Sequence, residues 1–206
     1  MKSGLNVVYA ITVVPRRNDS YMFHYPNAEM GEVVARAIGL KPIKKQVSGV
    51  KEKEVDELME IISMLDIDGL VIGTIASKYQ KERVDRISNK LGLEVYAPLW
   101  EMNPEEYMSS LLRDGFKVMI IGVYAMGIEH LLGKIIDENV LEELRGTHQR
   151  YKVHLAGEGG EFETLVLDGP IFKKKIVLRE YEVRKGLYRG EIVIKDYVLV
   201  NKKSTL

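Results

Sequence analysis

The chain has 206 residues, of which 46% are hydrophobic, so it is long enough for one good core or for one domain with a smaller appendix. Its 30 Lys and Arg residues balance 30 Asp and Glu residues, which argues against a dedicated nucleic-acid binder because there is no basic excess to release counterions. The lack of cysteine excludes disulfides and thiolate chemistry. The sequence has no apolar run of membrane-spanning length and no signal-peptide pattern, so we expect a cytoplasmic protein.

Strands and helices are predicted to alternate through the first 125 residues. Residues 7–14 and 117–123 are continuous apolar runs, typical of strands that are covered on both faces. This alternation favours an α/β fold with an open parallel sheet and helices on both faces. The other predicted elements are helices at about 28–38, 51–65, 77–91 and from Asn103 to Gly115, and strands at 42–47, 69–73 and 94–96.

The remainder of the chain is predicted to be rich in strands. A helical segment at about 138–145 is followed by strand patterns at 151–156, 162–167, 175–183 and 191–200. These segments predict an antiparallel C-terminal appendix. We therefore divide the chain into an α/β domain at 1–125 and a C-terminal subdomain at 126–206.

The run from Gly157 to Thr164 is the most informative stretch of the chain. It places three glycines and three glutamates within eight residues, between two apolar segments. Carboxylates crowded at a turn repel one another unless a magnesium ion, an ammonium group or an arginine is shared among them. A solvated acidic hairpin is the alternative interpretation, and the residue pattern alone does not choose between them.

Ligands of open parallel sheets bind beyond the carboxyl ends of strands, and three segments lie at such places. The aromatic-rich loop 18–24 could stack on a base or fold its rings into the core. In segment 73–83, small residues open a helix at which Ser77 and Lys78 would face an anion, although an ordinary capped helix has the same pattern. Segment 122–127 has small residues that allow a ligand to approach closely.

The four histidines give no sign of a metal centre, because none has metal-ligand spacing to another. We therefore predict no metal-ligating residue. His154 alternates with Val153 and Leu155, so it either faces the glycine-rich turn or has a structural role. Trp100, considered by its position alone, is most simply a core anchor.

Several segments, taken together and in order, are specific enough to indicate a protein family, although any one of them alone would not be. With them the chain resembles the diphthine–ammonia ligase family, part of the N-type ATP pyrophosphatase group with an adenine nucleotide alpha hydrolase-like fold. The segments span roughly residues 7–172 and are Ser20–His24, Gly73 with Ala76–Gln80 and Arg83, Leu91–Leu93 with Pro98–Trp100, Leu132-Gly133, and Gly157–Thr164 continued by Leu167-Asp168 and Pro170.

This resemblance implies a reaction and its partners. ATP, together with Mg²⁺, would adenylate the carboxylate of diphthine, a modified histidine on translation elongation factor 2, and ammonia would then displace AMP. The reaction needs an anion cradle for the phosphates and a pocket for a trimethylammonium group, which carboxylates or aromatic faces can supply. The first domain would then bind the nucleotide and the C-terminal subdomain would face the substrate, with no membrane and no nucleic acid as a partner.

The resemblance also implies the roles of individual residues. The acidic run supplies the candidate catalytic carboxylates Glu158, Glu161 and Glu163. The candidates for binding the nucleotide are His24, Gly73, Ser77, Lys78, Gln80 and Arg83. The candidates for binding the substrate are Tyr79, Trp100, Gly159, Gly160 and Thr164.

The chain departs from the family at its start. The family opens with a strand and a Ser-Gly-Gly-Lys-Asp-Ser phosphate loop, and this sequence does not occur here. Residues 1–6 have the pattern of a helix end with Gly4 as its cap, so we expect a misplaced or shortened start in preference to a degenerate relative. We expect impaired activity without the loop, and an open edge beside residues 7–14 that invites a homodimer. Other hypotheses are an adenylating enzyme acting on another substrate, such as an RNA base, and a non-catalytic nucleotide-binding protein.

Overall fold

The structure, a computed structural model, describes residues 4–16 and 27–202. These residues form two compact units. The N-terminal unit comprises the described residues of Tyr9–Glu32 and Pro42–Met102. The C-terminal unit comprises the described residues before Tyr9, the segment Val33–Lys41, and the described residues from Asn103 onward. The predicted domain boundary at residue 125 stays a prediction.

The N-terminal unit contains two pairs of parallel strands. Strands β1 (Tyr9–Pro15) and β2 (Lys41–Val47) are joined through helix α1 (Met30–Ile38), which from Val33 onward is counted with the C-terminal unit. Their direction follows from two hydrogen bonds at opposite ends, in which the Lys41 amide donates to the Val8 carbonyl and the Arg16 amide to the Val47 carbonyl, at 3.1 and 3.0 Å. Strands β3 (Gly69–Val71) and β4 (Glu94–Tyr96) also pair in parallel. The predicted strand–helix–strand crossovers are thus confirmed, but they form two two-stranded sheets among the described residues and not one open sheet.

Two amphipathic helices supply the core of this unit. Helices α2 (Lys53–Ile62) and α3 (Lys78–Leu91) bury apolar residues that recur at helical spacing. Gly92 ends α3 in a left-handed conformation, at φ 69°, which glycine adopts without steric cost. The buried members of the resulting cluster are Val55, Leu58, Ile62, Val84 and Ile87, with residues of β1, β3 and β4 packed against them.

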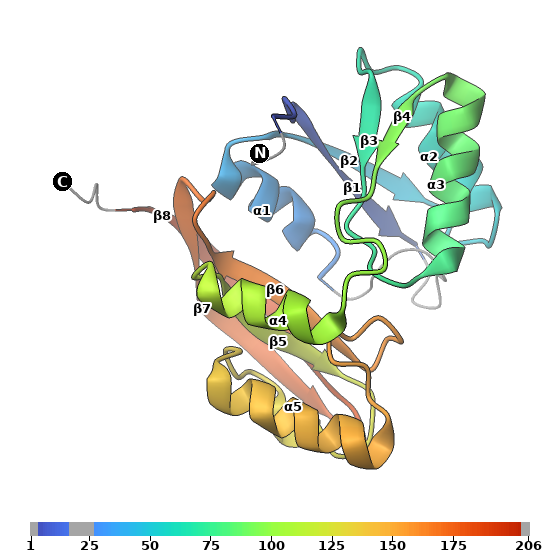
Figure 1. Ribbon diagram of the computed structural model, residues 1–206. Coiled ribbons are helices and arrows are strands. Elements are labelled where there is room, and N and C mark those ends of the chain that lie inside the picture. The colour runs from blue at the N-terminus through green and yellow to red at the C-terminus, as the bar shows by residue number, and fades with distance from the viewer. Residues whose placement is uncertain (1–3, 17–26, 203–206) are drawn as a thin grey trace. The chain divides into compact units, whose positions relative to one another are not determined.

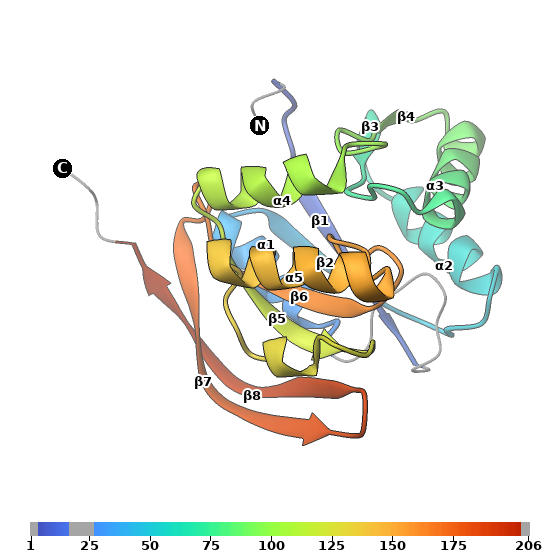
Figure 2. The same cartoon turned by 60° about the horizontal axis from the view of Figure 1, so that its bottom comes forward.

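The C-terminal unit is built on a four-stranded antiparallel sheet with the order β6-β5-β8-β7 (Figure 1). Figure 2 shows that β7 and β8 form a long hairpin. One expectation was wrong: β5, the most apolar strand, joins this antiparallel sheet and not a parallel one. Its six buried residues reflect cover on both faces, which does not reveal strand direction. The strands are β5 (Lys117–Val123), β6 (Phe162–Asp168), β7 (Lys174–Lys185) and β8 (Gly190–Asn201).

Helices α4 (Pro104–Arg113) and α5 (Glu138–Tyr151) belong to the largest core cluster of this unit. Met108 of α4 and Leu141 and Leu144 of α5 pack in that cluster with Val118 and Ile120 of β5, so both helices cover the same face of the sheet (Figure 1). A short 3-10 helix, η1 (Glu129–Leu131), lies between β5 and α5 along the chain.

The predicted strand at residues 151–156 is a second correction. Tyr151 is the last residue of α5, and Lys152 ends the helix in the left-handed region at φ 61°. Val153 and Leu155 are buried and alternate with less buried neighbours, which imitates a strand, but the segment forms turns. Within residues 4–16 and 27–202, no helix combines the length and the apolar character needed to cross a bilayer.

Candidate functional site

The start of α3 is arranged as an anion-facing helix end. The Ser77 hydroxyl caps the helix by accepting from the Gln80 amide at 3.4 Å, and the Ser77 amide donates to the Thr74 hydroxyl at 3.2 Å. The first turn of the helix has no acidic residue, so no carboxylate of this turn offsets the positive end of the helix dipole. Lys78 is exposed beside it. Four of the predicted nucleotide residues, Gly73, Ser77, Lys78 and Gln80, are therefore brought together.

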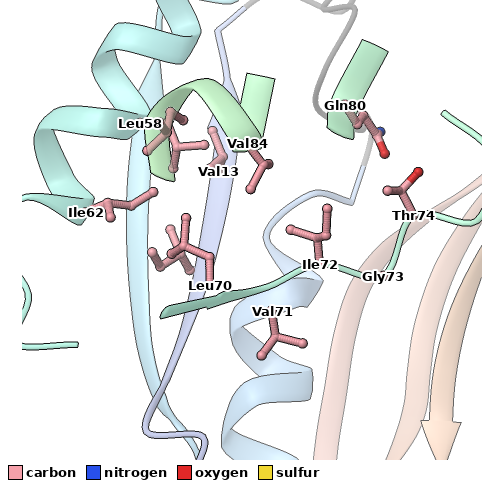
Figure 3. Close-up of a pocket in the computed structure, with 12 residues that line it drawn as sticks. Val13, Leu58, Ile62, Leu70, Val71, Ile72, Gly73, Thr74, Gln80 and Val84 are labelled. Carbon is pink, nitrogen blue, oxygen red and sulfur yellow. The ribbon is translucent and has the colours of Figure 1, made fainter. Parts of the chain in front are cut away.

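A mainly apolar cleft of about 260 Å³ opens in the N-terminal unit next to this helix start (Figure 3). Gly73, Thr74 and Gln80 line one part of it, and the other lining residues are aliphatic. The aliphatic lining comes from β1, α2, β3, the residue that follows β3, and α3: Ile11, Val13, Leu58, Ile62, Leu70, Val71, Ile72, Val84 and Ile87. The arrangement joins an apolar wall to a polar edge, which is the usual composition of a small-molecule pocket.

Arg83 is held by contacts within the protein. Its Nε and Nη2 donate to Glu52 Oε1 at 3.1 and 2.5 Å, and its Nη1 donates to the Tyr79 carbonyl at 3.2 Å. The guanidinium carbon lies 3.4 Å from the centre of the Tyr79 ring, and Arg86 Nη1 donates to the second Glu52 oxygen at 2.8 Å. The hydrogen bond from Arg83 is the main reason that the pKa of Glu52 is lowered. Arg83 could therefore meet a phosphate only by giving up or sharing these partners.

The aromatic residues predicted to bind the substrate lie in the N-terminal unit. Tyr79 is stacked under Arg83, and the Trp100 ring centre is 5.6 Å from Lys81 Nζ. Both aromatics are thus packed against basic side chains of α3. His24, the remaining predicted nucleotide residue, lies outside the described residues.

The glycine-rich run in the C-terminal unit is a compact turn that leads into β6. Gly157 and Gly160 have φ values of 70° and 78°, which glycine adopts without steric cost. The Gly157 amide donates to the His154 carbonyl and the Gly160 amide to the Gly157 carbonyl, both at 3.0 Å. A Cβ at position 157 would lie 2.8 Å from the Phe162 carbonyl oxygen, so the chain at this position has no room for a side chain.

Glu161 uses both carboxylate oxygens to hold this turn. Its Oε1 accepts from the His154 amide at 2.8 Å, and its Oε2 accepts from the Gly159 amide at 3.0 Å. A Cβ at Gly159 would lie 2.7 Å from that carboxylate, which places the two groups in close contact. The predicted substrate residue Gly159 therefore binds Glu161, while Gly160 and Thr164 are exposed.

Glu158 and Glu163 lie in different surroundings. Burial raises the pKa of Tyr107 on α4, and the negative charge of Glu158 raises it further. Glu163 is paired across the sheet with Gly122, which is also paired with Glu191 on the other side of β5. Burial, followed by the charges of Glu163 and Glu191, raises the pKa of Tyr124, so this phenol stays protonated. Each of the two carboxylates is thus close to a neutral tyrosine.

Some residues around these sites were not predicted from the sequence. Glu52 gives no signal because its partner Arg83 is 31 positions away and its own residue type is ordinary for a helix start. Glu191 and Tyr124 come together only through strand register. Within residues 4–16 and 27–202, no three His, Asp or Glu side chains are arranged to hold a metal ion.

Comparison with known proteins places these segments in one family. Residues 1–95 match the family model described as the diphthamide synthase N-terminal domain, and residues 103–200 match the diphthamide synthase C-terminal domain. A Homo sapiens protein named diphthine–ammonia ligase is 33% identical over 184 residues, covering 80% of this chain and 68% of that protein. Proteins of the same name from Danio rerio and Schizosaccharomyces pombe are 32% and 30% identical, covering 78% and 80% of this chain, and 69% and 30% of their own lengths. The chain therefore belongs to the diphthine–ammonia ligase family.

Proposed function

We propose that this protein is an ATP-dependent carbon–nitrogen ligase that converts diphthine on translation elongation factor 2 to diphthamide, the last step of diphthamide biosynthesis. The observation that carries this proposal is the ordered match of both halves of the chain to the two diphthamide synthase domains, together with 33% identity over 184 residues to the Homo sapiens protein named diphthine–ammonia ligase. A carboxylate oxygen of diphthine attacks the α-phosphorus of ATP, and pyrophosphate leaves. Ammonia then attacks the acyl carbon, AMP leaves with the C–O electron pair, and the nitrogen loses a proton.

The N-terminal unit is proposed to bind ATP with an adenine nucleotide alpha hydrolase-like arrangement. The parallel pairs β1–β2 and β3–β4, each joined through a helix, support this assignment. Backbone amides at the start of α3, with Ser77 and Lys78, would meet phosphate oxygens, and Gly73 and Gln80 would line the adjoining part of the site. Arg83 and Tyr79, both on α3, would hold its first turns in place through their mutual contact and the pairing of Arg83 with Glu52, and His24 stays a nucleotide-binding candidate that the resemblance implies.

The C-terminal unit is proposed to present carboxylates to the cationic substrate and to ammonia. Glu158 and Glu163 would attract the trimethylammonium group of diphthine or take the proton that the attacking nitrogen loses. Glu161 would keep the turn in shape, with Gly159, Gly160 and Thr164 leaving room for the substrate. Trp100 would offer an aromatic face to a cation. Mg²⁺ would reach the site with the ATP phosphates, as is usual for this ion at nucleotide sites.

The proposal is tested by measuring AMP formation from ATP in the presence of ammonia and elongation factor 2 that carries diphthine. We expect AMP only when all three are present, and a loss of at least about tenfold in kcat/KM for Glu158→Gln or Glu163→Gln, the scale of one lost acid–base or charge contact. Glu180→Gln, which removes an exposed carboxylate on β7, is the matched control and should leave the rate unchanged. ATP binding without AMP release would instead support a non-catalytic nucleotide-binding protein, and AMP release that depends on RNA would indicate another substrate.

A further inference from the structure

His154 has a role beyond that of a structural residue before β6. Its ring nitrogen Nδ1 accepts from the Ala156 amide at 3.2 Å and from the Glu158 amide at 3.4 Å. Its own amide donates to Glu161 Oε1, and its carbonyl accepts from the Gly157 amide. One residue therefore binds the turn through its ring, its amide and its carbonyl.

Three backbone amides of the turn donate to these side chains. The amides of Ala156 and Glu158 meet the His154 ring, and the amide of Gly159 meets Glu161. A partly buried amide that loses its acceptor is destabilising, so the backbone would move to regain one. Such a movement would displace the Glu158 side chain, which projects from the same segment.

We propose that His154 is a positioning residue for the reaction, which sets the place of the Glu158 carboxylate through the amides that its Nδ1 accepts. This proposal rests on the proposed function, because it assigns Glu158 to the substrate side of the site. His154 itself does not need to touch the substrate. A shift of about 1 Å in a positioned group can lower a rate by about 100-fold, so we expect losses of about 10- to 100-fold.

The test compares His154→Asn with His154→Gln. The asparagine side-chain oxygen takes roughly the place of Nδ1, whereas the glutamine amide group takes roughly the place of Nε2. We expect His154→Asn to retain most of kcat/KM for the diphthine-bearing factor, His154→Gln to lose about 10- to 100-fold, and both to keep the KM for ATP. Equal rates for the two variants would overturn the proposal.

A second readout does not depend on catalysis. In NMR spectra of the full chain, the amide resonances of Ala156 and Glu158 should shift more in His154→Gln than in His154→Asn, because only the asparagine keeps an acceptor near the place of Nδ1. Equal shifts in the two variants would refute the contact. If the wild type forms no AMP while the two variants differ in this way, the proposed function fails and the turn contact stands. If AMP forms and the shifts are equal, the proposed function stands and the His154 inference fails.

Discussion

Alanine substitutions at two glycines of the turn should separate backbone strain from steric collision. Gly157 and Gly160 have similar positive φ values, 70° and 78°. They differ in surroundings: a Cβ at 157 would meet the Phe162 carbonyl oxygen at 2.8 Å, whereas a Cβ at 160 would have no heavy atom within 4 Å. Gly160→Ala is therefore a matched control for Gly157→Ala.

The expected magnitudes follow from this difference. The left-handed conformation costs an alanine about 1–2 kcal/mol, and the stiffer unfolded chain returns about 0.4–1 kcal/mol, so Gly160→Ala should lower the free energy of unfolding by about 1 kcal/mol. Gly157→Ala adds a collision with backbone, which cannot move aside as a side chain does. Overpacking of this kind costs a further amount of about 1–3 kcal/mol, so the total loss should be about 2–4 kcal/mol.

Urea unfolding followed by circular dichroism measures both free energies, and AMP formation measures the effect on the site. We expect Gly157→Ala to lose more stability than Gly160→Ala by at least 1 kcal/mol or so, the lower limit of the overpacking cost, and to lose more activity. Equal losses of stability would refute the reasoning, because they would mean that the turn relaxes around Phe162 or that its backbone differs from the one described.

Two further predictions concern the C-terminal unit. Leu144→Ala, at a fully buried position of α5, should lower the free energy of unfolding by about 2–5 kcal/mol in a denaturant titration. The control Met64→Ala, at a side chain that is 73% exposed, should change the free energy of unfolding by no more than about 0.5 kcal/mol. Equal effects would contradict the packing of α5. Glu105 of α4 accepts from Arg145 of α5, and this hydrogen bond lowers the pKa of Glu105 below its ordinary 4.5. A lowered pKa contributes stability above the ordinary value and loses it as the pH falls, so Glu105→Gln should melt below the wild type at pH 7, and the gap should narrow as the pH falls below about 4.5. A gap that is constant with pH would show that the ion pair is not its cause.

The sequence predicts the helices and strands of this protein well where a periodic pattern of apolar residues is long. It does not predict which strands pair with one another or in which direction. The bounds of β5 agree with prediction because an apolar run that begins shortly after Gly115 can be recognised from local information alone. Its antiparallel partners could not be predicted, since a strand that is buried on both faces looks the same in either direction. The segment 153–156 was mistaken for a strand because a turn with two buried residues two positions apart has the same alternation.

The candidate sites show the same limit at the level of single residues. Ser77 could be assigned because a helix cap depends on neighbours two or three positions away. Residue type and spacing make Glu158, Glu161 and Glu163 equivalent, yet the structure gives Glu161 two backbone donors and places the charges of the other two near Tyr107 and Tyr124. Likewise, the resemblance implied that Arg83 binds the nucleotide, and no local pattern reveals Glu52 as its partner.

The two candidate sites differ in the sign of the charge that they offer, and this difference matches the proposed chemistry. The first turn of α3 provides lysines and backbone donors without a carboxylate, which suits the polyphosphate of ATP. The run 157–164 provides three carboxylates without a lysine or arginine, which suits a trimethylammonium group and an ammonium ion. Adding a lysine to the run, as in Thr164→Lys on the exposed side of β6, should therefore weaken binding of the diphthine-bearing factor without weakening the binding of ATP. Weaker binding of ATP with unchanged binding of the factor would mean that the acidic run and the basic helix start serve other ligands.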